Sequence, residues 1–247
     1  MQPVHSRLAL SALICGAVLL ATTACTDREA QRQAQAAAEA QAREQAATKL
    51  QGEYDAAVAA NNWELARIHG TALLAQYPGT EAAAAVEPAL ADVTARADAA
   101  REQRRLAALW NYARVAAGKG EQRTAAIFSK EPFDTGGSAP ATVQLVIRDH
   151  PEWKRSAYLV LEGGDFDCYG GCKVKVAFDD AAAKPMSAWR PKTDEAIAMF
   201  IEDYRGLWKQ MRKAQVLEIE FPVKAGGTRT AVFEVGGLDG SQMPGWD

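Results

Sequence analysis

The chain has 247 residues, of which 48% are hydrophobic and 24% charged, and its formal net charge at pH 7 is −3. These proportions are those of a globular protein, so they exclude wholesale disorder. A slightly acidic chain has no general attraction for nucleic acid, and we expect no nucleic-acid partner. Its 4 cysteines are too few for a cysteine-rich mini-scaffold.

Alanine and the aromatic residues are unevenly distributed along the chain. Residues 1–117 contain 36 alanines and residues 118–247 only 15, whereas 16 of the 19 aromatic residues lie at or after Trp110. Alanine is the strongest helix former, while aromatic residues favour strands and fill cores. We therefore predict an α+β protein in which a helical front half precedes a separate β-rich domain.

The first 24 residues have the pattern of a secretory signal. His5 and Arg7 precede an apolar run of 14 residues from Leu8 to Ala21. At about 1.5 Å per residue this run spans roughly 21 Å, which is short of the about 30 Å of a hydrocarbon core. It therefore predicts a signal peptide over residues 1–24 rather than a membrane-spanning helix.

Residues 20–25 (LATTAC) resemble the end of a bacterial lipoprotein signal. In that family the signal is cleaved before a cysteine, which becomes the lipid-bearing first residue. Ala24 and Cys25 match the pattern, whereas the family usually has leucine at the position of Thr22. The resemblance implies that Cys25 is acylated and anchors the protein to the membrane. The alternative is an ordinary secretory cleavage near the same place, with Cys25 incidental.

The residue after the cysteine bears on the destination of such a protein. Several acyl chains attach a protein durably, whereas a single chain holds it only marginally. The lipoprotein family retains proteins with aspartate after the cysteine at the inner membrane, and this chain has Thr26 there. The resemblance therefore implies a protein anchored at the outer membrane, on its periplasmic side.

Residues 25–52 are predicted to form a helical spacer. From residue 27 onward they are almost entirely Ala, Gln, Glu and Arg, which are strong helix formers, and no proline interrupts them. The apolar positions are nearly all alanine and offer little area for burial. A solvated spacer is the simpler interpretation, and an alanine-rich coiled coil for self-association is the alternative.

Residues 53–108 are predicted to form a helical hairpin followed by a long helix. Asn61 and Asn62 mark the turn of the hairpin, and residues 77–80 (YPGT) end its second helix. The spacing of Trp63, Ala66, Leu73, Leu74, Tyr77, Pro78 and Ala83 resembles one tetratricopeptide-like helix pair. A lone repeat cannot build a binding superhelix, because stacked neighbours are needed to bury its faces.

After about residue 109 the hydrophobic period changes from 3.6 to 2. Three segments have this alternation: 143–147, 217–221 and 231–235. An amphipathic helix is expected within residues 200–211, with Lys209, Arg212 and Lys213 outward, although residues 196–201 also fit a strand. We predict that residues 109–247 form a mainly antiparallel β-sandwich or open barrel with one helix.

Residues 165–175 (DFDCYGGCKVK) predict a hairpin with a three-residue turn at 169–171. In that register Asp165 faces Lys175, and Cys168 faces Cys172 within disulfide range. An oxidising periplasm would close the bond. Redox disulfides favour a CxxC spacing at a helix start, and no histidine lies within 15 residues of either cysteine. We therefore expect a structural disulfide rather than a redox or zinc site.

Several ordered landmarks occur in the C-terminal region: residues 110–112 (WNY), Leu145, Arg148, 150–151 (HP), Cys168, 172–174 (CKV), 178–180 (FDD) and 233–238 (FEVGGL). Together they resemble an uncharacterised β-rich domain of exported bacterial proteins, over roughly residues 108–240. The resemblance implies export and a β-rich fold, and it implies no activity.

No arrangement of residues in the sequence indicates catalysis. Ser-His-Asp chemistry would have to use His150, and no nucleophile-elbow pattern is present. No phosphate loop, dinucleotide fingerprint or spaced calcium loop is present either. We therefore predict no catalytic residue, cofactor or metal. Arg148 and His150, at a strand end before Pro151, are the candidate binding residues.

These observations lead to two hypotheses about function. The first is a non-catalytic, lipid-anchored periplasmic protein whose β-rich domain binds a protein or another envelope component. The alternative is a periplasmic hydrolase that uses His150 and nearby acidic residues. A deep pocket converging on His150 would favour the enzyme, whereas a shallow apolar patch on the sheet would favour binding.

Overall fold

The computed structural model describes the backbone of residues 13–192 and 197–246, and the side chains of residues 28–192 and 197–246. The predicted acylation of Cys25 and the whole of the predicted signal peptide therefore lie outside the described side chains. Among the described residues, no helix combines the length and apolar character that crossing a membrane requires. The chain divides into two compact units, Met1–Ala99 and Ala100–Asp247.

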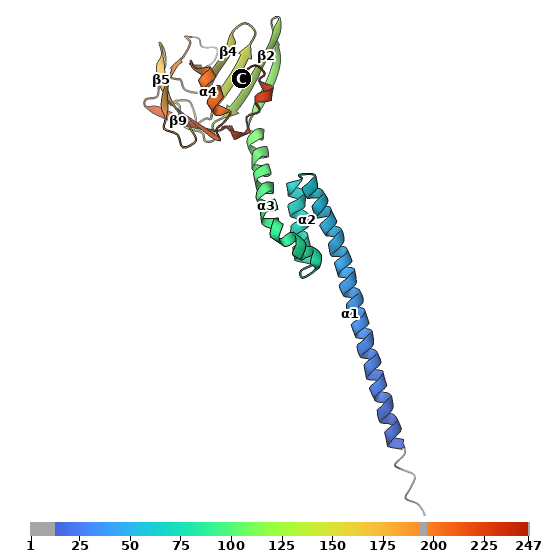
Figure 1. Cartoon of the computed structure of the whole chain (residues 1–247). Helices are drawn as coiled ribbons and strands as arrows, with labels where there is room; N and C mark the ends of the chain where they lie inside the picture. Colours follow the sequence, from blue (N-terminus) through green and yellow to red (C-terminus); the bar gives the residue numbers. More distant parts are fainter. Residues whose placement is uncertain (1–12, 193–196, 247) are drawn as a thin grey trace, which may run out of the picture. The chain divides into compact units, whose positions relative to one another are not determined.

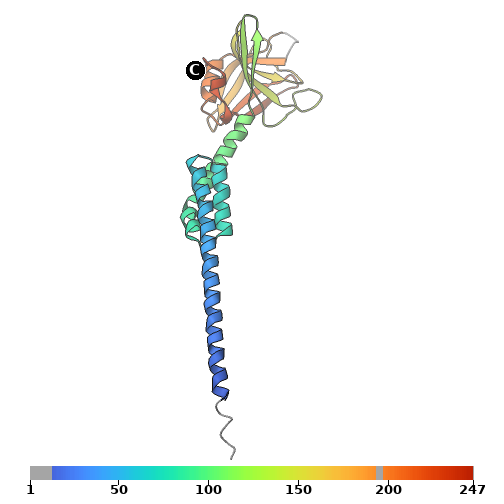
Figure 2. The ribbon, with the colours of Figure 1, turned by 90° about the vertical axis from the view of Figure 1, so that its right-hand side faces the viewer.

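The first unit is helical (Figure 2). It contains α1 (Leu13–Ala59), α2 (Trp63–Gln76) and the first part of α3 (Glu81–Ala108). The side chain of Asn62 caps α2 by accepting a hydrogen bond from the backbone N–H of Leu65 at 3.2 Å. The helical hairpin and its turn are therefore confirmed at the predicted position.

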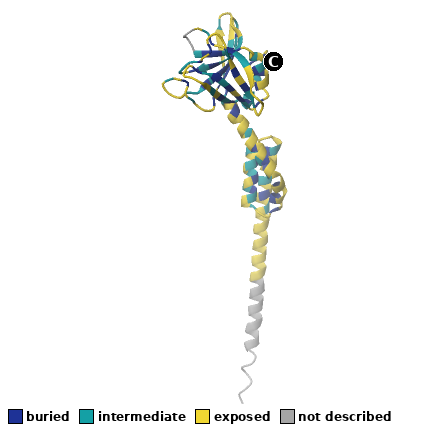
Figure 3. Ribbon diagram, turned by 90° about the vertical axis from the view of Figure 1, so that its left-hand side faces the viewer, coloured by how far each residue is buried: buried dark blue, intermediate teal, exposed yellow. Residues whose placement is uncertain are grey.

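A small core holds these helices together. Its members include Tyr54, Ala66, Leu73 and Val86. Gly70 allows α2 to approach its neighbours closely, since a Cβ at this position would lie 2.7 Å from Cδ1 of Leu90. Within this chain residues 28–43 of α1 are exposed on every side, as the yellow ribbon in Figure 3 shows.

The second unit is built on one antiparallel sheet in the order β1-β2-β3-β4-β7-β6-β5-β8-β9. The strands are β1 (Asn111–Ala117), β2 (Gly120–Phe128), β3 (Val143–His150), β4 (Lys154–Leu161), β5 (Cys172–Phe178), β6 (Lys184–Trp189), β7 (Ile197–Ile201), β8 (Val216–Pro222) and β9 (Thr228–Glu234). Figure 1 shows the sheet curled into an open barrel, with α4 (Tyr204–Met211) packed against it. The fold is therefore α+β, as predicted.

The core of this unit lies inside the curled sheet. Leu145, Leu159, Met199 and Phe233 come from four strands and are fully buried there, together with Trp208 of α4. The three segments with period 2 correspond to β3, to β8, and to β9 with the residue that follows it. The alternating apolar side chains of each segment, which begin at Val143, Leu217 and Ala231, are buried. Residues 196–201, whose sequence fits either a helix or a strand, contain the strand β7.

The predicted hairpin at residues 165–175 is wrong. Both edges of β5 are paired elsewhere, with β6 on one side and β8 on the other. Lys175 therefore faces Glu220, with which it forms an ion pair at 2.8 Å, and not Asp165. The disulfide Cys168–Cys172 is present with Cα atoms 5.0 Å apart, but it closes a loop at the start of β5.

Candidate functional site

The helix α4 forms one wall of a groove in the second unit. The carboxylate of Asp203 caps the helix by accepting a hydrogen bond from the backbone N–H of Gly206 at 2.9 Å. The buried side chains of the helix are Leu207, Trp208 and Met211. Since these face the core, the basic side chains of Arg205 and Lys209 are exposed on the opposite face, one helical turn apart.

We call this hollow the cationic groove. It has a volume of about 670 Å³. It is lined by Arg155, Tyr204, Arg205, Trp208, Lys209, Arg212, Lys213 and Trp246. Five of these side chains are basic and none is acidic. A lining of one sign attracts anions, and the volume falls within the about 300–1,000 Å³ typical of ligand sites.

Arg155 places a fixed positive charge in the wall of the groove. Its Nε lies 3.1 Å from Oδ2 of Asp149, which holds the side chain in position. Its guanidinium carbon also lies 5.6 Å from the ring centroid of Trp246. A guanidinium has five N–H donors, so the pairing with Asp149 leaves this group able to contact an anion as well.

The floor of the cationic groove is aromatic. The ring centroid of Trp246 lies 5.1 Å from that of Trp208 and 5.7 Å from that of Tyr204. The indole N–H groups of Trp208 and Trp246 are buried, and neither has an acceptor among the described residues. Because both N–H groups are buried, the groove presents its basic side chains rather than these donors to a ligand.

A second hollow of about 440 Å³ adjoins the cationic groove. Arg155 and Tyr204 line both hollows, so the two lie side by side. The second hollow also contains Arg148 and Ser156. Nε of Arg148 and Oγ of Ser156 are buried without a hydrogen-bond partner among the described residues.

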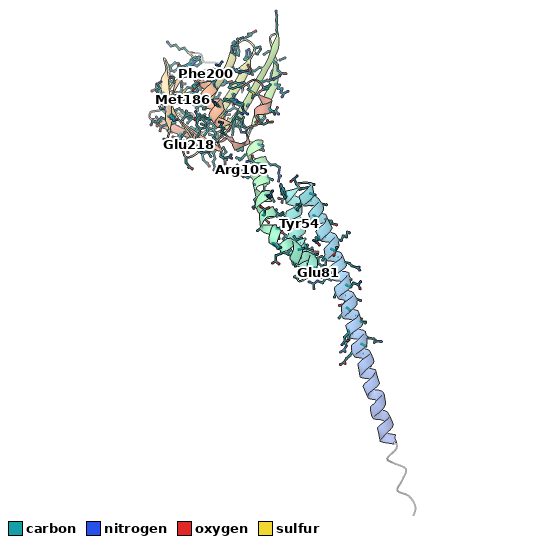
Figure 4. The ribbon with its side chains drawn as sticks, in the orientation of Figure 1. Tyr54, Glu81, Arg105, Met186, Phe200 and Glu218 are labelled. Atoms are coloured by element: carbon teal, nitrogen blue, oxygen red, sulfur yellow. A yellow bond between two sulfur atoms is a disulfide. The ribbon has the colours of Figure 1, made fainter. Side chains whose placement is uncertain are left out.

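Aromatic side chains cross the outer face of the sheet beside the second hollow. Trp189 of β6 pairs with Phe200 of β7, and Phe200 pairs with Tyr158 of β4. The ring centroids in each pair are 4.9 Å apart. Phe200, labelled in Figure 4, lies between the other two rings. Trp189 is 42% exposed, so a large ring is available to solvent.

Trp153, in the turn between β3 and β4, extends this series of rings. The guanidinium of Arg148 lies between Trp153 and Tyr158, with its carbon 5.2 Å and 5.1 Å from their ring centroids. Burial raises the pKa of the Tyr158 phenol, although the Arg148 charge opposes the shift. Trp153 is 64% exposed. We call Trp189, Phe200, Tyr158 and Trp153 the aromatic row.

The structure places the two predicted binding residues in different surroundings. Arg148 lines the second hollow, whereas His150 lines neither hollow. Nδ1 of His150 accepts hydrogen bonds from the backbone N–H groups of Glu152 and Trp153, each at 3.1 Å. Its buried ring stacks on Trp153 with centroids 4.1 Å apart. His150 therefore holds the turn that positions Trp153.

Most residues that line the cationic groove could not be predicted from the sequence. The helical pattern placed Lys209, Arg212 and Lys213 outward, which is a correct signal of a basic face. Arg155 lies far before α4 in the chain and Trp246 lies far after it. Only the folded domain brings these two residues next to α4. No local spacing in the chain could have indicated their proximity.

Among the described residues, no group of three or more histidine, cysteine, aspartate or glutamate side chains is arranged to hold a metal ion. The chain matches no family model, no curated protein and no solved structure.

Proposed function

We propose that this protein is a non-catalytic, lipid-anchored periplasmic protein that binds a negatively charged component of the bacterial envelope. Cys25 is the proposed site of acylation, and the outer membrane is its proposed location. The second unit is the proposed binding domain. The observation that carries the binding proposal is the cationic groove, with five basic side chains and no acidic one in its lining.

The chemistry of the groove supports binding rather than catalysis. Its basic groups are arginines and lysines, which attract anions but do not provide a nucleophile beside a base. His150, on which the hydrolase alternative depends, uses Nδ1 for two backbone hydrogen bonds and stacks its ring on Trp153. These contacts favour a role in the turn, so the binding protein is the better proposal.

Crosslinking in intact cells tests the proposed binding. A photo-reactive amino acid replaces Lys209 in the cationic groove or, as a control, the exposed Glu218 of β8, labelled in Figure 4. We expect position 209, but not position 218, to crosslink to an envelope component, and we expect Arg205→Glu with Lys213→Glu to abolish the crosslink. Equal crosslinking from both positions, or a crosslink that survives the charge reversal, would contradict the proposal.

Metabolic labelling tests the proposed anchor. Cells are fed labelled palmitate, and the wild type is compared with Cys25→Ser. The wild type should carry the label and fractionate with the outer membrane, whereas the variant should lose both properties. Equal labelling of the two proteins, or a wild type that is soluble in the periplasm, would exclude the lipid anchor while leaving the binding proposal in place.

A further inference from the structure

We propose that the cationic groove and the aromatic row form one binding surface for an acidic polysaccharide, a chain of sugar rings that carry negative charges. This inference rests on the proposed function and specifies the class of the envelope component. It requires that the two features be adjacent, that rings be exposed to solvent, and that the basic groups lie beside the rings.

The shared lining places the two features next to each other. Arg155 and Tyr204 line both hollows, while Trp189, Phe200 and Trp153 line the second hollow alone. The surface thus extends from the basic face of α4, over the start of β4, to the outer face of β7 and β6. An elongated ligand can contact the groove and the aromatic row at the same time.

Two rings of the aromatic row are exposed to solvent. Trp153 and Trp189 are among the exposed large hydrophobic side chains of the second unit, at 64% and 42% exposure. The face of an aromatic ring is negatively polarised, so the positively polarised C–H groups on the flat side of a sugar ring pack well against it.

The distribution of charge indicates that the sugar is acidic. Arg205, Lys209 and Lys213 provide three exposed cations in the groove, and Arg155 adds a fourth at the junction with the second hollow. Only Glu202, in the second hollow, brings an acidic side chain to either lining. A neutral polysaccharide would offer no counter-charge to Arg205, Lys209 and Lys213, whereas carboxylates or phosphates on the sugars would neutralise them.

The same features favour a glycan over the other anionic macromolecules. An acidic peptide can satisfy the cationic groove without a series of rings across β6, β7 and β4. An anionic membrane surface is flat, whereas here Arg155 and the basic face of α4 line a hollow. A glycan that carries both flat ring faces and negative charges can use the aromatic row and the groove together.

Isothermal titration calorimetry with defined polymers tests this inference. The protein is the chain from residue 25 onward with Cys25→Ser, so that both units are retained and no lipid interferes. The probes are oligogalacturonate, its fully methyl-esterified neutral form, poly-glutamate, and vesicles of phosphatidylglycerol. Oligogalacturonate should bind, and methyl esterification should weaken its binding by about tenfold or more.

Variants separate the contributions of the rings and the charges. Trp189→Ala and the pair Arg205→Glu with Lys209→Glu should each weaken oligogalacturonate binding by about tenfold or more. Trp189→Phe, which keeps a ring, should restore most of the affinity. The pair Arg101→Glu with Arg104→Glu, on the exposed face of α3, is the matched charge control and should leave binding unchanged.

The outcomes distinguish this inference from the proposed function. If poly-glutamate or the vesicles bind and respond to the α4 charge reversal, but oligogalacturonate does not bind, the groove is an anion site and the glycan inference is wrong. If oligogalacturonate binds but Trp189→Ala has no effect, the inference is also wrong. If no anionic probe binds, both the inference and the proposed binding function are overturned. Melting curves confirm that each variant is folded.

Discussion

The ammonium group of Lys224 lies 2.7 Å from Oδ2 of Asp165, and the buried guanidinium of Arg190 hydrogen-bonds Oδ1 of the same carboxylate. The phenol of Tyr169 donates a hydrogen bond to Oδ2 at 3.2 Å. The guanidinium of Arg190 and the ammonium of Lys224 lie 4.5 Å and 4.2 Å from the Tyr169 ring centroid. This cluster ties the loop that contains the disulfide to the residues that follow β6 and β8.

Asp165→Asn should destabilise the second unit by about 2–3 kcal/mol, because the buried Arg190 loses a charged acceptor. Asp167→Asn, the same change at an exposed position two residues away, is the control and should alter stability by less than about 0.5 kcal/mol. Urea unfolding followed by tryptophan fluorescence measures both variants. Equal effects of the two substitutions would show that the cluster contributes nothing specific.

The same carboxylate makes stability depend on pH in a defined direction. Burial acts to raise the pKa of Asp165, but hydrogen bonds from Lys224 and Arg190 outweigh it, so the folded-state pKa lies below the ordinary 3.8. The stability that this group contributes is therefore fully present above the unfolded-state value and is lost as pH falls through the folded-state value.

The free energies of unfolding of the wild type and of Asp165→Asn should consequently approach each other at acidic pH. The difference between their free energies of unfolding should be constant above about pH 5 and should shrink below about pH 4. Other carboxylates with lowered pKa values, such as Glu234, are present in both proteins and cancel in the difference. Unfolding curves over this pH range provide the measurement, and a gap that widens as the pH falls would exclude the assigned direction.

The disulfide should stabilise the second unit without taking part in redox chemistry. Cys168 is 1% exposed and belongs to the hydrophobic core. The chain-entropy model for so short a loop gives about 2 kcal/mol, so Cys168→Ala with Cys172→Ala should lower the melting temperature by about 4–8 °C and leave the protein folded.

A trapping experiment distinguishes this role from a redox role. Cys172→Ala leaves Cys168 as a thiol that would hold a substrate as a mixed disulfide if the pair exchanged with other proteins. Because the sulfur of Cys168 is buried, we expect no such adduct in cells. Recovery of a specific mixed disulfide through Cys168 would mean that the pair is a redox site.

The helical hairpin and three of the strands could be predicted because their signals are local. The turn at Asn61 and Asn62, and the period-2 alternation of β3, β8 and β9, depend on neighbouring residues alone. The hairpin at residues 165–175 failed for the opposite reason. Its local register is favourable, yet β6 and β8 pair with both edges of β5, and long-range pairing decided the outcome.

The candidate site was harder to predict than the fold. The basic residues of α4 recur at helical spacing, which is visible in the sequence. The proximity of the rings in the aromatic row depends instead on the strand order, which places β7 between β4 and β6. Trp189, Phe200 and Tyr158 become neighbours only through that order. The disulfide Cys168–Cys172 was predicted from the register of the hairpin at residues 165–175; the bond is present although the hairpin is not.

The end of α3 belongs to the second unit. Arg105 Nη2 lies 2.7 Å from Oε1 of Glu234, and Leu106 is buried at 5% exposure. The backbones pack so closely here that a Cβ on Gly237 would lie 2.2 Å from the carbonyl carbon of Leu106. The last two turns of the helix should therefore contribute to the stability of the β-rich domain.

Two fragments test this boundary. Residues 100–247 should melt cooperatively on their own, because the core of the second unit lies within them. Residues 110–247, which lack Arg105 and Leu106, should unfold at a lower temperature, since burial of one leucine alone contributes about 1.5–3 kcal/mol. Gly237→Ala in the longer fragment should reproduce that loss, because its new methyl group cannot coexist with the helix backbone at the present distance. If the two fragments melt alike, the domain begins after α3 and the helix end is only a linker.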